Sequence, residues 1–384
     1  MSQVSRVLIQ GAGIGGLVAA TALAQRGVHV DVVEHRASGS VLGVGLNQPG
    51  NALRVMQEIG LLDDCLEAGY QYRDLRMVAP DSGVIVDMPP PAHPGVPPNN
   101  GIQRRELCRI LLGAARDAGA HLHHGVTISS IREDADGVDA AFAVTADGAA
   151  LPAPGRYDLL LGFDGIRSQV RRHLFGDRYP AEYTGFACWR ISLPRPEQLD
   201  RVVYAVSGQI KATLIPLSDD DCYVALVVPQ EHLRARYSAE EIADRIRALL
   251  GEFTGWLGGL AGLVSEESAS AAYSPIEQVT VREPWFQGRI AVAGDAAHAS
   301  SPHMAQGAAM AAEDAVVLAQ CLDSAEPLDK ALQTWWERRM RRAGFVQEYS
   351  AALLRSESGV PTPEDEKLLK LPIPAAQARL AEPY

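Results

Sequence analysis

A glycine-rich turn between a short apolar strand and an apolar helix, close to the start of the chain, constrains the fold more than any other feature. Residues 6–10 (Arg-Val-Leu-Ile-Gln) predict a buried strand, residues 11–16 read Gly-Ala-Gly-Ile-Gly-Gly, and a helical pattern follows. In such a motif the first glycine permits the tight turn, the second lets a pyrophosphate approach the backbone, and the third lets the helix pack on the strand. The helix N-terminus adds free N–H groups and a positive dipole. The sequence therefore predicts a nucleotide-binding βαβ unit whose three glycines are Gly11, Gly13 and Gly16.

An acidic residue at the end of the second predicted strand narrows the choice of nucleotide. Residues 28–33 form that strand, and Glu34 follows it directly. An acid at this place accepts hydrogen bonds from an adenosine ribose, while its charge repels a 2′-phosphate. The ligand is therefore expected to be FAD or NAD and not NADP. Gln10 departs from the pattern, because an apolar strand residue is expected there. The other neighbours expected for the nucleotide are Ile14, Gly15, His35 and Arg36.

Composition and charge exclude several classes of function. The chain has 384 residues, 47% of them hydrophobic, and a formal net charge of −12. Such a charge disfavours nucleic acid as a partner, and no apolar run reaches the roughly 20 residues that a membrane helix needs. The N-terminus lacks the order of segments that marks a secretory signal, which favours a cytoplasmic protein. The five cysteines are scattered without metal-ligand spacing and are expected to be reduced thiols.

A run of histidines invites a metal-site interpretation that the sequence does not support. His121 and His123 alternate with Leu122 along a predicted strand, so they share a face, while His124 points to the other face. No carboxylate or cysteine set is expected near them, so we predict solvated histidines and no metal site.

Two further strand ends carry polar residues. The strand 157–161 leads into Gly-Phe-Asp-Gly-Ile-Arg-Ser at residues 162–168, and the strand 289–293 leads into Gly294 and Asp295. Residues 302–308 (Pro-His-Met-Ala-Gln-Gly-Ala) then open a long helix. Between these pieces the pattern changes to short spaced strands, which predict an inserted antiparallel sheet. These strands are 186–191, 201–206, 211–217 and 222–228. Residues 75–78 and 84–88 predict a hairpin, and Ser238 with Glu241 predicts a capping box for the helix that follows.

The glycine turn, the 162–168 segment, and Gly294-Asp295 with its downstream helix start together resemble the single-component FAD-dependent aromatic hydroxylases, the p-hydroxybenzoate and salicylate hydroxylase group. The 302–308 run is similar to that of 6-hydroxynicotinate 3-monooxygenase-like enzymes. The resemblance implies an α/β protein with a Rossmann-type FAD-binding fold, an inserted antiparallel-sheet substrate domain and a long C-terminal helix. The expected divisions are 1–72, 101–180 and 284–322 for FAD binding, 73–100 and 181–283 for the substrate sheet, and 323–384 for the C-terminal helix and tail.

The resemblance also implies roles for particular residues. Asp295 would accept hydrogen bonds from ribityl hydroxyls, and the helix that starts at Gln306, Gly307 and Ala308 would direct its N–H groups at the flavin edge that becomes negative on reduction. Asp164 matches a motif that braces the FAD site, although Phe163 stands where the family has alanine. Arg104 matches an arginine near FAD, with Arg105 as its competitor. Gly45, in a predicted loop, and Val126 complete the expected cofactor set.

The expected activity is hydroxylation of a phenol-like or hydroxypyridine-like ring through a flavin hydroperoxide, with NADH or NADPH as a transient reductant and molecular oxygen as co-substrate. A base that deprotonates the ring hydroxyl raises the rate, and His303 is the first candidate. The expected substrate contacts are Asn47, Trp189, Tyr204 and Tyr223. The alternative is an FAD-dependent reductase or dehydrogenase of the same fold that inserts no oxygen. A flavin-binding sensor is a third class, and a homodimer is an expected assembly.

Overall fold

The computed structural model describes residues 4–37, 44–89, 93–146, 149–152, 155–233, 236–265 and 271–384. The predicted nucleotide-binding strand β1 (Arg6–Gln10) lies inside a six-stranded sheet of order β18-β19-β12-β1-β2-β8. All pairs in this sheet are parallel except β18–β19. Its other strands are β2 (His29–Glu34), β8 (His121–His124), β12 (Leu159–Gly162), β18 (Phe286–Gln287) and β19 (Ile290–Val292).

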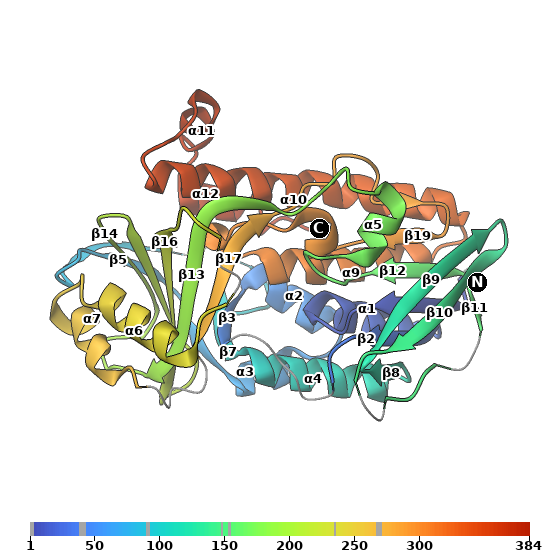
Figure 1. Cartoon of the computed structure of the whole chain (residues 1–384), viewed down its shortest axis with the longest axis horizontal. Helices are drawn as coiled ribbons and strands as arrows, with labels where there is room; N and C mark the ends of the chain where they lie inside the picture. Colours follow the sequence, from blue (N-terminus) through green and yellow to red (C-terminus); the bar gives the residue numbers. More distant parts are fainter. Residues whose placement is uncertain are drawn as a thin grey trace.

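Helices and a small sheet cover the six-stranded sheet, as a parallel sheet requires on both faces. Helix α1 (Ile14–Ala24) follows β1 and packs against α4 (Arg104–Asp117) and α9 (Gly307–Leu322). A three-stranded sheet, β11-β10-β9, contacts the strands β1, β2 and β12 (Figure 1). Its bounds are β9 (Val126–Asp134), β10 (Gly137–Val144) and β11 (Arg156–Tyr157).

The predicted inserted sheet is present and has seven strands, in the order β17-β13-β16-β15-β14-β5-β6. It is not wholly antiparallel, because β14 pairs with β5 in parallel. This difference arises because the predicted hairpin at residues 75–88 comes from a distant part of the chain and adds to the sheet edge. The strands are β5 (Leu75–Val78), β6 (Val84–Met88), β13 (Glu182–Pro194), β14 (Val202–Ser207), β15 (Ile210–Pro216), β16 (Asp221–Pro229) and β17 (Ala272–Gln278).

One face of the seven-stranded sheet is covered by α6 (Ala239–Leu250), α7 (Gly255–Gly259) and the short helix η1 (Leu260–Leu263). A capping box starts α6: Ser238 Oγ accepts from the N–H of Glu241 at 3.1 Å, and the N–H of Ser238 donates to Glu241 Oε2 at 2.7 Å. This confirms the cap that the Ser-x-x-Glu pattern indicates.

A third sheet, β3-β7-β4, packs against β15 and β16 of the seven-stranded sheet, and its strands are β3 (Gly45–Pro49), β4 (Gly69–Tyr72) and β7 (Asn99–Gln103). The prediction of a loop at Gly45 is therefore wrong. Gly45 pairs with Gln103 of β7, a partner too far along the chain for local sequence to indicate. Helices α2 (Gly50–Glu58) and α3 (Leu62–Glu67) follow β3.

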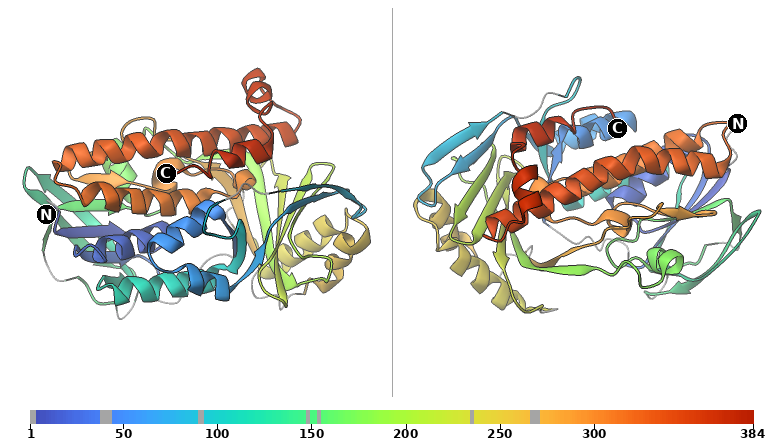
Figure 2. Two further views of the ribbon diagram at one scale, coloured as in Figure 1. Left: turned by 180° about the vertical axis from the view of Figure 1, so that it is seen from behind. Right: turned by 90° about the horizontal axis from the view of Figure 1, so that it is seen from above.

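The long helix α10 (Leu328–Glu357) runs along the molecule from the six-stranded to the seven-stranded sheet (Figures 1 and 2). It packs on α9 and on the short helix η2 (Pro302–Met304). No helix in the described ranges is both long and apolar enough to cross a membrane. The remaining helices are α5 (Gln169–Phe175), α8 (Asp295–His298), α11 (Pro363–Leu368) and α12 (Ile373–Ala378).

Candidate active site

A cavity of about 520 Å³ lies where the carboxyl ends of the parallel strands meet the seven-stranded sheet. Most of the residues predicted for the cofactor and the substrate line it, although they come from segments scattered over the chain. They are Gly11, Gly13, Ile14, Gly15, Glu34, His35, Arg36, Gly45, Asn47, Arg104, Asp164, Tyr204, Tyr223, Asp295, His303, Gln306, Gly307 and Ala308. Gly16, Val126 and Trp189 do not line it.

The glycines of the first turn have different surroundings. Gly11 has a φ of +106°, and a Cβ added there would lie 2.4 Å from the carbonyl oxygen of Phe163. A Cβ added to Gly16 would lie 2.0 Å from the carbonyl oxygen of Gly11, so Gly16 permits the close packing of helix on strand. A Cβ added to Gly13 meets no atom within 4 Å. Gly13 therefore leaves open space at the cavity, which is the arrangement that a pyrophosphate needs.

Glu34 is fixed at the edge of the cavity by the turn itself. Its Oε2 accepts from the N–H of Ala12 at 2.9 Å, and its Oε1 accepts from the N–H of Arg36 at 2.9 Å. The Nδ1 atom of His35 lies 2.9 Å from the same Oε1. The carboxylate is thus oriented beside the glycine turn, where a ribose would lie.

The departure at Gln10 has a structural reason. Gln10 is buried, its Nε2 donates to Thr127 Oγ1 at 3.0 Å, and its Oε1 accepts from the N–H of Ile128 at 3.1 Å. A buried amide with both ends bonded carries no unsatisfied polar group. Gln10 therefore ties the central strand to β9, next to Val126, which lies in the core and not at the cavity.

Asp164 caps a helix while it faces the cavity. Its Oδ1 accepts from Ser168 Oγ at 2.5 Å, and its Oδ2 accepts from the N–H groups of Gln169 and Val170 at 2.7 and 3.1 Å. Burial raises the pKa of Asp164. The neighbouring Phe163, in place of alanine, is accommodated because Gly15 leaves room: a Cβ on Gly15 would lie 2.7 Å from the Phe163 ring.

Of the two competing arginines, Arg104 lines the cavity, whereas Arg105 lies 3.6 Å from Glu106 with 73% of its side chain exposed. Asp295 is exposed at the cavity directly after Gly294, which has a φ of +56°. Gln306 precedes α9, and its Oε1 accepts from Asn51 Nδ2 at 2.9 Å.

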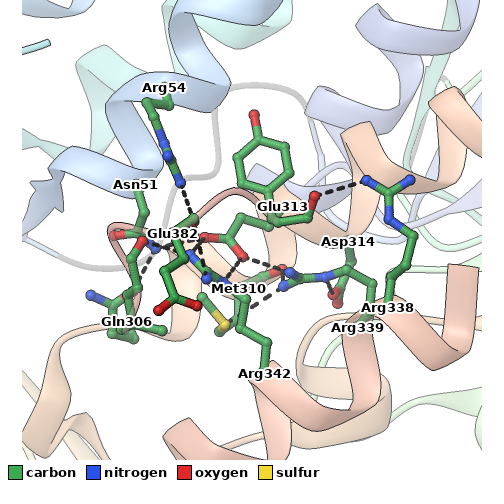
Figure 3. Close-up of polar contacts among 12 residues, drawn as sticks. Asn51, Arg54, Gln306, Met310, Glu313, Asp314, Arg338, Arg339, Arg342 and Glu382 are labelled. Atoms are coloured by element: carbon green, nitrogen blue, oxygen red, sulfur yellow. Dashed lines mark hydrogen bonds and ion pairs between the residues drawn. The ribbon is translucent and has the colours of Figure 1, made fainter. Parts of the chain in front are cut away.

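A buried network of charges joins the middle of α9 to α10 (Figure 3). The wholly buried Arg339 donates to Glu313 Oε2 at 2.6 Å and to Asp314 Oδ1 at 2.8 Å, and Arg342 donates to Glu313 Oε2 at 2.7 Å. Burial opposes ionisation of Asp314, but the charges of His298 and Arg339 outweigh it and lower its pKa to about 2. Sequence reasoning missed this network, although an acidic pair inside an apolar helix was a usable signal.

The seven-stranded sheet supplies the other wall of the cavity. Tyr223 Oη accepts from Arg190 Nε at 3.1 Å, and burial raises the pKa of Tyr223 to about 12, so the phenol keeps its proton. Lys211 lines the wall with its Nζ 5.6 Å from the centre of the Tyr204 ring. Asn47 Oδ1 accepts from Tyr72 Oη at 2.6 Å. Sequence reasoning missed Lys211.

The prediction of Trp189 as a cavity residue is wrong. Side chains alternate along a strand, and on β13 it is Cys188 that lines the cavity. Trp189 points into the core beneath α6, with the rings of Tyr237 and Tyr273 at centroid distances of 4.8 Å.

His303 is buried and lines the cavity. Its Nδ1 lies 3.1 Å from Ser301 Oγ, whose own hydrogen is donated to the carbonyl oxygen of Ser350 at 3.0 Å. Its Nε2 lies 3.3 Å from Glu357 Oε2. Burial lowers the pKa of His303.

The histidines of β8 have a carboxylate beside them, contrary to prediction. Asp31 on the neighbouring β2 lies 3.5 Å from His121 and 3.6 Å from His123, and His29 lies 3.4 Å from it. Parallel pairing of β2 with β8 brings these residues together, which local sequence does not reveal. Arg6 and the Tyr157 hydroxyl donate to the same carboxylate at 3.1 and 3.0 Å, so it is already engaged within the chain.

The fold and the cavity together are those of a nucleotide-binding oxidoreductase, because a glycine turn, an acid at the end of β2 and a helix start line one cavity. The residues fit FAD, because Gly13 leaves space for a pyrophosphate while Glu34 and Asp295 stand at separate stretches of the same cavity. The FAD binding domain family matches residues 4–346. The chain belongs to this family, and it is an FAD-dependent monooxygenase of the aromatic hydroxylase type.

Individual relatives agree with this assignment. A Bacillus subtilis (strain 168) protein, YetM, which its name describes provisionally as an FAD-dependent monooxygenase, is 34% identical over 354 residues, covering 91% of this chain and 93% of that protein. The 6-hydroxynicotinate 3-monooxygenase of Pseudomonas fluorescens is 29% identical over 372 residues, 91% of each chain. The structure of Klebsiella pneumoniae HpxO complexed with FAD and uric acid has the same fold, with a TM-score of 0.78 and 24% identity over 100% of this chain and 94% of that one.

Proposed function

We propose that this protein hydroxylates a small electron-rich aromatic or heteroaromatic ring that carries a hydroxyl group, with NADH or NADPH as the reductant. One observation carries the proposal: the residues expected to hold the flavin share a single cavity with three polar side chains. These side chains are Lys211 and Tyr223 of the sheet wall and His303 of η2. The named relatives act on hydroxynicotinate and bind uric acid, both of which are polar rings of this size.

Individual residues of the chain would each have a separate role in the hydroxylation. FAD, when bound and reduced, supplies the activation of oxygen. The apolar wall that includes Ile215 and Val227 keeps water from the reacting ring. Tyr223, held neutral, donates a hydrogen bond to a ring substituent, and Lys211 balances a negative ring oxygen. His303 takes the proton of the ring hydroxyl, which makes the ring more electron-rich.

The experiment is a panel of 6-hydroxynicotinate, urate, salicylate and p-hydroxybenzoate with the purified holoenzyme. Oxygen uptake, NADH or NADPH oxidation, and peroxide release are measured together, and product is analysed after reaction under ¹⁸O₂. A substrate that stimulates nicotinamide oxidation and gains one labelled oxygen atom supports the proposal. Stimulated oxidation with a reduced or dehydrogenated product, and no label, would instead establish the reductase alternative. The homodimer and the cytoplasmic location expected from the sequence remain predictions.

A further inference from the structure

Glu357, the last residue of α10, lies behind the wall of the cavity and contacts two residues that line it. Its Oε1 accepts from Lys211 Nζ at 2.7 Å, and its Oε2 lies 3.3 Å from His303 Nε2. The Glu357 side chain is 28% exposed, whereas that of His303 is 1% exposed. The carboxylate therefore lies between the buried histidine and the surface of the molecule.

The hydrogen bonds around His303 settle which of its nitrogens can accept a proton. The hydroxyl of Ser301 donates its hydrogen to the carbonyl oxygen of Ser350, so toward Nδ1 of His303 it can act only as an acceptor. Nδ1 therefore carries a hydrogen, and Nε2 has the free lone pair of the neutral ring.

Nε2 of His303 and Oε2 of Glu357 face one another without other partners. Each is buried, and neither makes a hydrogen bond with any described residue. Two acceptor atoms at 3.3 Å repel one another until a proton enters between them, after which they form a charge-assisted hydrogen bond. The pair is thus arranged to receive one proton.

We propose that Glu357 is a positioning residue that makes His303 the proton acceptor of the cavity and holds Lys211 at its wall. This role of Glu357 rests on the proposed hydroxylation. In the step, the O–H bond of the ring hydroxyl breaks and its electron pair stays on the ring oxygen. Because Nε2 of His303 is buried against Glu357, the proton crosses through one intervening water, and an N–H bond forms at His303 Nε2. Glu357 then balances the imidazolium, and Lys211 balances the ring oxygen.

The charges around the pair agree with this arrangement. Burial opposes ionisation of Glu357, yet its neighbours His303 and Lys211 hold its pKa below its usual range. In the described part of the chain, the charged or titratable groups acting on His303 are Glu357 from α10 and Lys211 from β15. Tyr204 from β14 faces Glu357, and burial raises its pKa to about 12, so it stays neutral.

The test follows the titration of His303 by NMR of ¹⁵N-histidine-labelled holoenzyme, assigned with His303→Gln. Removal of an opposite charge at this distance lowers a histidine pKa by roughly one to three pH units, so Glu357→Gln should shift the His303 titration down by about that amount. Lys211→Met should shift it upward. Glu348→Gln, at an exposed position on the same helix, is the matched control and should leave it unchanged.

A second readout uses whichever substrate the panel identifies. In Glu357→Gln the acid limb of the kcat profile should move to lower pH, with a loss of roughly threefold to tenfold in kcat from the weaker base and unchanged FAD content. An unmoved His303 titration in Glu357→Gln would overturn the proposal. Because the titration needs no substrate, that result is separate from failure of the panel, which would overturn only the hydroxylation.

Discussion

The backbone N–H of Gly294 donates a 3.0 Å hydrogen bond to Oδ2 of Asp314, so the turn that presents Asp295 to the cavity is fastened to the middle of α9. The same oxygen lies 2.6 Å from His298 Nε2. Arg339 holds the other oxygen. The position of Asp295 therefore depends on a charge network whose members do not line the cavity.

Arg339→Met should destabilise the protein strongly. The variant leaves the buried carboxylates of Glu313 and Asp314 without their shared partner, and breaking a buried pair in this way costs about 3–5 kcal/mol. Thermal unfolding should show a melting temperature lower by several degrees, with FAD lost on gel filtration. Arg341→Met, at an exposed position two residues on, is the control and should melt like the wild type. Equal melting temperatures for both variants would contradict the role of the network.

The network also predicts how stability responds to acid. The folded-state pKa of Asp314 is about 2, below the unfolded value of about 3.9. Its contribution is therefore present above about pH 4 and is lost as the pH falls through 2. Asp314→Asn should be less stable at pH 6 and should lose less of its remaining stability between pH 4 and pH 2. Urea midpoints across this range measure both effects, and parallel curves for variant and wild type would refute the assignment.

The glycines of the first turn should respond differently to alanine. Gly16→Ala forces a Cβ to within 2.0 Å of a carbonyl oxygen, so the apoprotein itself should be destabilised. Gly13→Ala meets no protein atom, so apoprotein stability should be unchanged while FAD affinity falls, because the pyrophosphate can no longer approach. Apoprotein melting and FAD titration separate the two effects. Gly113→Ala, whose Cβ also meets nothing, is the control for both.

Asp295→Ala should weaken FAD retention, because the carboxylate at the end of β19 is expected to accept hydrogen bonds from the ribityl chain. The flavin-to-protein absorbance ratio after dialysis measures the loss. Asp177→Ala, an exposed aspartate remote from the cavity, should retain flavin like the wild type. Unchanged retention in Asp295→Ala would remove this residue from the cofactor site.

His303→Ala should keep FAD and lose roughly two to four orders of magnitude in hydroxylation, the usual range for removal of a general base. The flavin spectrum and stopped-flow turnover report the two properties independently. Near wild-type turnover with an unshifted pH profile would exclude His303 and direct the search to Tyr223 or to the acidity of the substrate itself.

Sequence reasoning succeeded where the signal is contiguous. The turn after β1, the acid at Glu34 and the cap of α6 each depend on residues within a few positions of one another, and the structure has the predicted local elements at all three. A short motif fixes its own backbone conformation, so little long-range information is needed.

It failed where two distant segments decide the outcome. The prediction placed Trp189 at the cavity, whereas its neighbour Cys188 lies there, so the two faces of β13 were assigned the wrong way round. Both faces of this strand are buried, and the sequence therefore lacks the alternation of polar and apolar residues that would have shown which face is which. Asp31 lies beside His121 only because β2 pairs with β8. Lys211 and Glu357 are 146 residues apart in the sequence, and no local pattern indicates that their side chains are in contact.

The length of α10 has a geometric consequence. Arg339 and Glu357 are 18 residues apart, which is five turns of helix and about 27 Å of rise, so the two side chains leave the same side of one rod. The middle of this helix belongs to the charge network, and its C-terminal end lies behind His303. A single inserted residue between them would turn Glu357 by about 100° away from the cavity. The number of residues in the helix, and not only their identity, therefore sets the distance between the charge network and His303.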